Sequence, residues 1–293
     1  MKKILVPVDF SEHTEGACSY AIEFAGQHGA TIRLFHTYSD QFIIADSSFP
    51  DAIDMSTMYN EELLKEILHQ SEKKMSDLKK ELESKVTREN RKSIVFESKI
   101  AAGEIERELT DLMAEFQPDL VVMGTKGIGK SLNMWGSVSN HIINNSLIPV
   151  MTVPEMKKFK GFKKIMLAAG LSDRNMDSID KLFTLFAEFQ SHIECIHFLI
   201  PEETENNEGM EVLKEHFGRE EKAGKINFRF VEVTDKKQNA IRKEIDDLSI
   251  DIIAFQPRKH NVFYNLFTRQ ITKKDLRATN VPLLALPALE SKD

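Results

Sequence analysis

The feature that most constrains the fold is an internal repeat, because a duplicated segment must build a similar unit twice. Residues 2–12 (KKILVPVDFSE) are echoed by residues 163–173 (KKIMLAAGLSD), an offset of 161 positions from 2 to 163. The same offset carries His36 onto His197. The repeat therefore relates the beginnings of two halves of the chain.

Later matches lie at a smaller offset. Residues 119–123 (DLVVM) match 251–255 (DIIAF) at an offset of 132, and residues 148–154 match 281–287 at an offset of 133. The second half is therefore shorter in its middle. We expect a first domain at residues 1–154, a linker at 155–161 and a second domain at 162–293, which suits a chain of 293 residues.

In each half, short apolar runs alternate with longer segments of helical period, which is typical of βαβ units around a parallel sheet. In the first half the expected strands are residues 4–8, 31–37, 93–98, 120–123 and 150–153. The expected helices are residues 11–27, 55–86, 103–117 and 132–145. The predicted fold class is α/β, with two tandem doubly wound domains, each a five-stranded parallel sheet flanked by helices.

Charge and cysteine content indicate the setting of the protein. The net charge of −7 argues against a nucleic-acid partner, because such binding depends on clustered Lys and Arg. The only two cysteines, Cys18 and Cys195, stand far apart, which favours a reducing compartment. No apolar stretch approaches the roughly 20 residues that span a bilayer. We expect a cytoplasmic protein without a membrane partner.

Two features of the first half converge where parallel sheets bind ligands, beyond the carboxyl ends of the strands. Asp9 ends the first expected strand and offers a carboxylate. The glycine-rich turn 124–131 (GTKGIGKS) follows the fourth, and Gly136 and Ser137 stand near the next helix. Glycines permit close backbone approach, and exposed N–H groups attract phosphate. The pattern favours a nucleotide site, although a tight turn and an Asp at the start of a helix remain alternative interpretations.

These motifs resemble those of the universal stress protein family, which carries a Pro-Val-Asp-like triplet after its first strand. The family also has Gly-x2-Gly, nine residues, and Gly followed by Ser or Thr after its fourth. The resemblance covers both halves and implies an adenine nucleotide alpha-hydrolase-like fold. It implies that Pro7, Val8 and Asp9 face adenine and that Thr37 lines the base or ribose pocket. The residues implied to wrap ribose and phosphates are Met123, Gly124, Lys126, Gly127, Gly136, Ser137, Val138 and Ser139.

One departure concerns the phosphate loop. Eight residues separate Gly127 from Gly136, one fewer than in the family, which would either tighten the loop or spoil it. The turn also satisfies the P-loop pattern Gly-x4-Gly-Lys-Ser, with Gly129, Lys130 and Ser131 at its end. Its place after the fourth strand argues against a true P-loop. Gly129 and Lys130 nevertheless join the predicted phosphate site, because both interpretations bring negative charge to this turn.

The second half lacks the same residues. By the offsets, Asp9 corresponds to Gly170, Gly124 to Gln256 and Gly127 to Lys259, while Gly136 and Ser137 correspond to Arg269 and Gln270. The second domain is therefore predicted to keep the fold without the nucleotide site.

Three functional hypotheses remain open. The first is a regulatory stress-response protein that binds ATP or a related adenine nucleotide, with or without Mg, in its first domain, and has no catalytic residue or metal site of its own. The second is a slow ATPase or phosphotransferase that uses Lys130 and Ser131. The third is a nucleotide-free scaffold. Members of the family commonly dimerise through their last strands, so the resemblance also implies an intramolecular pseudo-dimer through residues 150–153 and 283–286, which would protect both edges. A homodimer is a further partner hypothesis.

Overall fold

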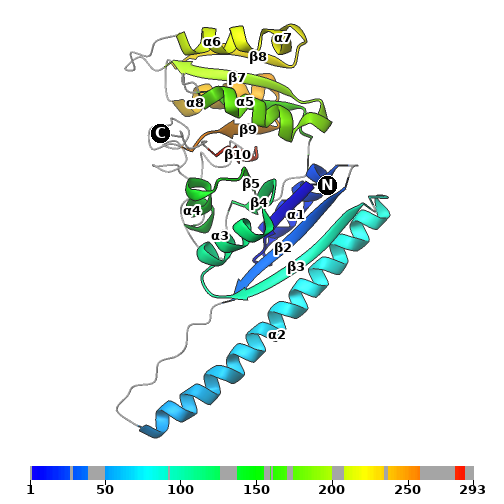
Figure 1. Ribbon diagram of the computed structural model, residues 1–293, viewed down its shortest axis with the longest axis vertical. Helices are drawn as coiled ribbons and strands as arrows, with labels where there is room; N and C mark the ends of the chain where they lie inside the picture. The colour runs from blue at the N-terminus through cyan, green and yellow to red at the C-terminus, as the bar shows by residue number, and fades with distance from the viewer. Residues whose placement is uncertain are drawn as a thin grey trace. The chain divides into compact units, whose positions relative to one another are not determined.

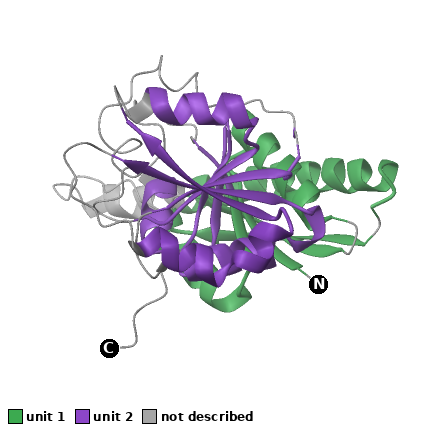
Figure 2. Cartoon of the chain, turned by 90° about the horizontal axis from the view of Figure 1, so that it is seen from above, with its two compact units in different colours: residues 1–122 green, residues 123–293 purple. Residues whose placement is uncertain are grey.

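The computed structural model (Figure 1) places most of the chain. The residues it describes are 2–26, 29–38, 50–91, 93–125, 137–154, 159, 161–169, 174–199, 208–233, 237–257 and 281–287. At residues 50–60, 137, 174, 175, 208, 237 and 238 only the backbone is described. The chain divides into two compact units, residues 1–122 and 123–293, which Figure 2 shows in different colours. The boundary between the two units falls between Val122 and Met123, inside a strand. The predicted domains at residues 1–154 and 162–293 therefore remain a prediction from the internal repeat.

Unit 1 is a parallel sheet with helices on its faces (Figure 1). Its strands follow the order β3-β2-β1-β4, and β1 pairs in parallel with both β2 and β4. The elements along the chain are β1 (Lys2–Pro7), α1 (Glu12–Ala25), β2 (Ala30–Tyr38), α2 (Pro50–Arg88), β3 (Ile94–Ala102), α3 (Ile105–Phe116) and β4 (Leu120–Gly124). The last two residues of β4 belong to unit 2.

Unit 2 has a sheet in the order β5-β10-β9-β6-β7-β8. Its strands are β5 (Val150–Val153), β6 (Lys164–Ala168), β7 (His192–Leu199), β8 (Ile226–Glu232), β9 (Ile252–Phe255) and β10 (Leu283–Ala285). Its helices are α4 (Ser137–Asn145), α5 (Arg174–Leu185), the 3₁₀ turn η1 (Ala187–Phe189), α6 (Glu208–His216), α7 (Gly218–Lys222) and α8 (Lys237–Leu248). The predicted α/β class with mostly parallel strands is confirmed.

One pair of strands in unit 2 is antiparallel. β10 pairs in parallel with β9 on one side and antiparallel with β5 on the other, where Leu284 lies opposite Met151. The expected meeting of residues 150–153 with 283–286 is thus confirmed. Because each strand then has a neighbour, neither leaves an exposed edge on that side.

Apolar periodicity placed the first helix correctly. The buried residues of α1 include Ala17, Ala21, Phe24 and Ala25, which are fully inaccessible to solvent. After the helix, Gly29 has a φ of +85°, and an added Cβ would meet the carbonyl oxygen of Ser93 at 2.6 Å. Glycine is therefore required where the chain turns into β2.

Two predicted elements proved too short. α2 begins at Pro50 rather than 55, because proline suits the first turn of a helix, where its missing N–H costs no bond. β3 continues to Ala102 rather than 98, because β2 pairs with it over all nine residues. Lys99, Ala101 and Ala102 are weak strand formers, so the tertiary pairing overrides their local preference.

The same polar bond joins the strands of both halves. The Asp119 carboxylate accepts the backbone N–H of Lys3 at 2.7 Å, and the Asp251 carboxylate accepts that of Lys164 at 3.0 Å. In return, the N–H of each aspartate donates to the carbonyl of that lysine at 2.8 Å. Residues matched by the internal repeat therefore make matching contacts.

We predict that Leu284→Ala lowers the free energy of unfolding by about 2–5 kcal/mol, the usual cost of a cavity at a fully buried leucine. Urea unfolding followed by circular dichroism measures the change. Leu147→Ala is the matched control, because Leu147 is 74% exposed and its loss should change stability by less than about 0.5 kcal/mol. Equal effects of the two changes would contradict the packing of β10.

Candidate functional site

The carboxylate of Asp9 holds the turn between β1 and α1. Its Oδ1 accepts the backbone N–H of Ser11 at 3.0 Å, the Ser11 hydroxyl at 2.6 Å and the Thr14 hydroxyl at 2.9 Å. The Thr14 oxygen in turn accepts the N–H of Asp9 at 3.2 Å. Ser11 occupies the N-cap position of α1, but its side chain caps no helical N–H and is bound to Asp9 instead.

The other carboxylate oxygen of Asp9 is available. Oδ2 is buried and has no hydrogen-bond partner among the described residues. Burial by itself would raise the pKa of Asp9, but the hydrogen bonds from Ser11 and Thr14 outweigh it and lower the pKa from its usual value. The turn therefore presents an ionised acceptor with one oxygen uncommitted within the described part of the chain, although such groups are normally satisfied.

His36 ties the end of β2 to the end of β1. Its Nδ1 lies 2.8 Å from the carbonyl oxygen of Val8, which can only accept, so this nitrogen carries the proton. Burial lowers the pKa of His36 and favours the neutral ring. The Phe10 ring packs against it with centroids 4.5 Å apart. His36 therefore has a hydrogen-bonding and packing role at the ends of these two strands.

The remaining unit 1 site residues lie at the same sheet edge. Pro7 is the last residue of β1 and pairs with Phe35, while Thr37 follows His36 and pairs with Ala101. Val8 is buried, and Thr37 is half-buried. Unit 1 thus brings Pro7, Val8, Asp9 and Thr37 to the carboxyl ends of two adjacent parallel strands, as the sequence predicts.

In unit 2, the end of β4 is bound to α4 and β5. The Ser139 hydroxyl donates to the carbonyl of Gly124 at 3.2 Å, and the N–H of Thr125 donates to the carbonyl of Val153 at 3.1 Å. Met123 and Ser139 are buried, whereas Val138 is half-buried. The hydroxyl of Ser139 therefore has a structural partner in addition to its predicted role toward phosphate.

Several predicted phosphate-binding residues lie outside the described residues. These are Lys126, Gly127, Gly129, Lys130 and Gly136, together with the side chain of Ser137. Ser131, the P-loop hydroxyl, lies outside them as well. Their assignment stays a prediction.

The second half repeats the backbone of the site with different side chains. His197 Nδ1 lies 2.9 Å from the carbonyl of Ala169, the counterpart of the His36 contact. At the position matching Gly124, however, Gln256 is buried and its Nε2 donates to the Ser178 hydroxyl at 2.6 Å. A side-chain hydrogen bond thus takes the place of a glycine, whereas the counterparts of Asp9 and Gly127 lie outside the described residues.

Sequence reasoning missed two residues of the site. Thr14 binds both the N–H and the carboxylate of Asp9, and the spacing Asp-x-Ser-x2-Thr is the signal that points to it. Phe10 has a φ of +60°, a conformation uncommon for a bulky side chain. Nothing in its local sequence indicates this backbone strain, which the contacts of Asp9 and His36 on either side hold in place.

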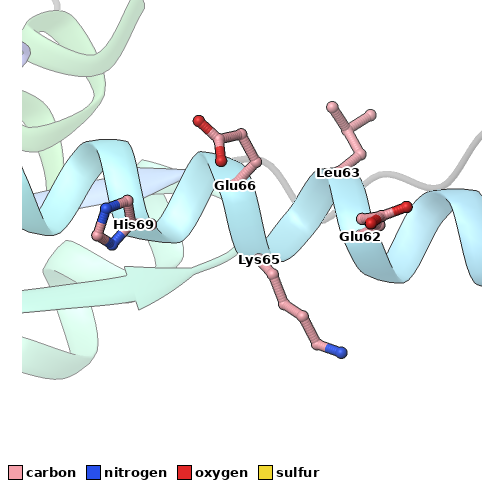
Figure 3. A pocket seen from close by; sticks show the side chains of 5 residues that line it. All are labelled: Glu62, Leu63, Lys65, Glu66 and His69. Carbon is pink, nitrogen blue, oxygen red and sulfur yellow. The ribbon is translucent and has the colours of Figure 1, made fainter.

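A hollow of about 520 Å³ lies away from these residues, along α2. Figure 3 shows its lining, in which Lys65 points to the opposite side of the helix from Leu63 and Glu66. All the lining side chains are exposed, and they come from one helix: Glu62, Leu63, Lys65, Glu66 and His69. Such an arrangement has no convergent polar groups and does not form a built site.

Metal and thiol chemistry find no support in the described part of the chain. No cluster of three His, Cys, Asp or Glu side chains there has the geometry to hold a metal ion. Cys18 and Cys195 are free and buried, and burial raises the pKa of each thiol to about 12. Thiols in this state are poor nucleophiles. Among the described helices, none is both long and apolar enough to cross a membrane.

Parallel strands flanked by helices define an α/β protein, and the polar turn at the carboxyl ends of β1 and β2 is its candidate site. The universal stress protein family model matches residues 1–154, and the chain belongs to that family. Universal stress protein MJ0577 of Methanocaldococcus jannaschii is 26% identical over 161 residues, which cover 52% of this chain and 94% of that protein.

Solved structures support the fold over the whole length. A universal stress protein from Archaeoglobus fulgidus aligns with a TM-score of 0.61 at 17% identity, covering 99% of this chain and 97% of its own. A functionally unknown protein from Pseudomonas aeruginosa, PA1789, aligns with a TM-score of 0.57 at 10% identity, covering 98% and 93%. At these identities the likeness concerns the fold alone.

The lowered pKa of Asp9 predicts a pH dependence of stability. Because the folded state favours the ionised form, this stabilisation is present above the ordinary pKa of 3.8 and is lost as the pH falls through the folded pKa. Asp9→Asn should therefore lower the free energy of unfolding by about 1–2 kcal/mol at pH 7 and by less at pH 3.

Urea unfolding at both pH values measures this difference. Asp111→Asn is the control, because it neutralises an exposed carboxylate on α3. A difference between Asp9→Asn and the wild type that grows as the pH falls would contradict the assignment.

Proposed function

We propose that this universal stress protein binds an adenine nucleotide, ATP or a relative, in residues 1–154 and acts as a regulatory binder rather than as an enzyme. The observation that carries the proposal is Asp9 Oδ2, a buried carboxylate oxygen without a partner among the described residues. It stands at the sheet edge where parallel α/β folds bind ligands. An adenine amino group is a donor that suits such an acceptor.

The neighbours of Asp9 support this choice of ligand. His36 Nδ1 donates to the carbonyl of Val8, whereas Asp9 Oδ2 has no donor among the described residues. Pro7 and Thr37 complete the proposed base and ribose contacts. Met123, Gly124, Val138 and Ser139 are proposed to continue toward the phosphates, together with the glycine-rich turn 126–136.

The second half is proposed to have lost this function. Its buried Gln256–Ser178 hydrogen bond stands where the first half has a glycine, and its sequence has Gly170 in place of the aspartate. Without a carboxylate acceptor, the base has no equivalent partner. The second half instead supplies β10, whose antiparallel pairing with β5 supports an intramolecular pseudo-dimer of two related domains.

The proposed setting is the cytoplasm. Two free, buried cysteines in different halves suit a reducing compartment. The net charge of −7 favours solubility over contact with nucleic acid. A magnesium ion would accompany the phosphates of ATP rather than bind a protein site of its own.

Calorimetric titration with ATP and with AMP tests the proposal. Asp9→Asn keeps an oxygen for Ser11 and Thr14 but can place an amide donor where Oδ2 accepts. This change should lower the affinity for both ATP and AMP about tenfold or more, because the two nucleotides share the adenine base. Gly127→Glu brings a negative charge to the phosphate turn and should weaken ATP more than AMP.

The control and the opposing outcomes are distinct. Asp111→Asn should bind both nucleotides like the wild type. If Asp9→Asn does so as well, the site assignment is wrong. Absence of both binding and co-purified nucleotide by mass spectrometry would favour the scaffold hypothesis. Steady turnover of ATP that Lys130→Ala abolishes would favour the enzyme hypothesis.

A further inference from the structure

The strand β3 forms an open edge of the unit 1 sheet. It pairs with β2 over nine residues and stands last in the strand order, so no described strand covers its other side. By contrast, β5 is already paired with β10. A long edge with unpaired backbone groups is a template for another strand unless its side chains prevent pairing.

On one face of β3, an exposed apolar side chain favours the addition of another strand at this edge. Val95 is 49% exposed, and among the large apolar side chains described as exposed it alone lies on a strand. The others, Leu63, Val212 and Leu147, lie on two helices and a loop. An exposed valine on an edge strand would lose its contact with water if a second strand were added.

Two charges of opposite sign follow on the same face. Glu97 is bound to Arg33 at 2.7 Å, and Lys99 is bound to Glu115 at 2.6 Å. These bonds hold both side chains in place while leaving 44% of Glu97 and 41% of Lys99 exposed. Both charges therefore remain accessible at the edge in fixed positions.

We propose that β3 pairs antiparallel with β3 of a second copy of this chain, about a two-fold axis at Ser98. In this register, opposing residue numbers sum to 196. Glu97 of one copy then lies opposite Lys99 of the other, and the exposed Val95 lies opposite Ala101. Opposite charges and apolar pairs across antiparallel strands stabilise the pairing. The small, exposed Ser98 leaves room at the axis.

Neighbouring registers and the other edge fit less well. An axis at Glu97 or at Lys99 would place like charges directly opposite each other, which destabilises a strand pair. At the far edge of the unit 2 sheet, β8 has Arg229 at its centre, so self-pairing there would oppose two arginines. Among the three central registers of β3, the charge pattern therefore favours the axis at Ser98.

Analytical ultracentrifugation of the full chain over a range of concentrations tests the proposal. We expect a reversible dimer. Lys99→Glu places Glu97 opposite a glutamate in both symmetric pairs and should weaken the dimer about tenfold or more. The double change Glu97→Lys with Lys99→Glu restores opposite charges between copies and should recover most of the affinity.

The double change separates the proposal from simple damage to the fold. The double change reverses the charge at both residues and so breaks the ion pairs with Arg33 and Glu115. If the charges acted only through the fold of each copy, the double variant would dimerise more weakly than Lys99→Glu alone. Val95→Glu should also weaken the dimer, whereas Val212→Glu, at a similarly exposed valine on α6, should leave it unchanged.

Cross-linking locates the axis. Ser98→Cys should give a covalent dimer on mild oxidation or with a short bis-maleimide, whereas Ser84→Cys, exposed on α2, should not. Cys18 and Cys195 are buried and do not compete. A chain that stays monomeric at every concentration overturns the proposal. The proposal is also overturned if the double variant dimerises as weakly as Lys99→Glu, or if the Ser98→Cys protein does not cross-link.

Discussion

The candidate site of this protein depends on the Asp9 carboxylate, whose two oxygens have different roles. Asp9 Oδ1 receives three donors from the first turn of α1 and fixes the path of the chain between β1 and that helix. Those bonds keep the group ionised despite its burial, so that Oδ2 remains an acceptor. The structural and functional interpretations of Asp9 are therefore complementary, because the bonds that position the side chain also maintain its charge.

The two halves share their strand-positioning contacts, although the residues at the proposed site differ between them. The contacts that position strands are backbone bonds and a few polar anchors, such as those of His36 and His197, and they are the same in both. Ligand recognition depends on a few side chains and on glycines. These can change without disturbing the sheet, as Gln256 does by bonding to Ser178. Gln256 is buried in this arrangement, and β9 stays in register with β6 and β10.

Edges impose a further constraint on a chain of this kind. The antiparallel contact of β5 with β10 lies within unit 2 and covers two strands that would otherwise be open. Open edges remain at β3 and β8 among the described strands. Charged side chains usually protect such strands, but alternating charges can also select a partner. On β3, the opposite charges of Glu97 and Lys99 are of the kind that selects a partner strand.

The sequence by itself determined the α/β class, the order of the elements in the first half and the residues at the ends of β1 and β2, because apolar periodicity and turn residues are local signals. The β5–β10 contact was predicted from the resemblance to the family, whose members commonly dimerise through their last strands. Only the tertiary structure decided the extra length of β3, which depends on its pairing with β2, and the positive φ of Phe10. It alone revealed that Ser11 binds Asp9 instead of capping the helix and that Asp9 Oδ2 lacks a described partner. Hydrogen-bond partners depend on distances between segments that fold together, and such distances are not encoded in any local pattern.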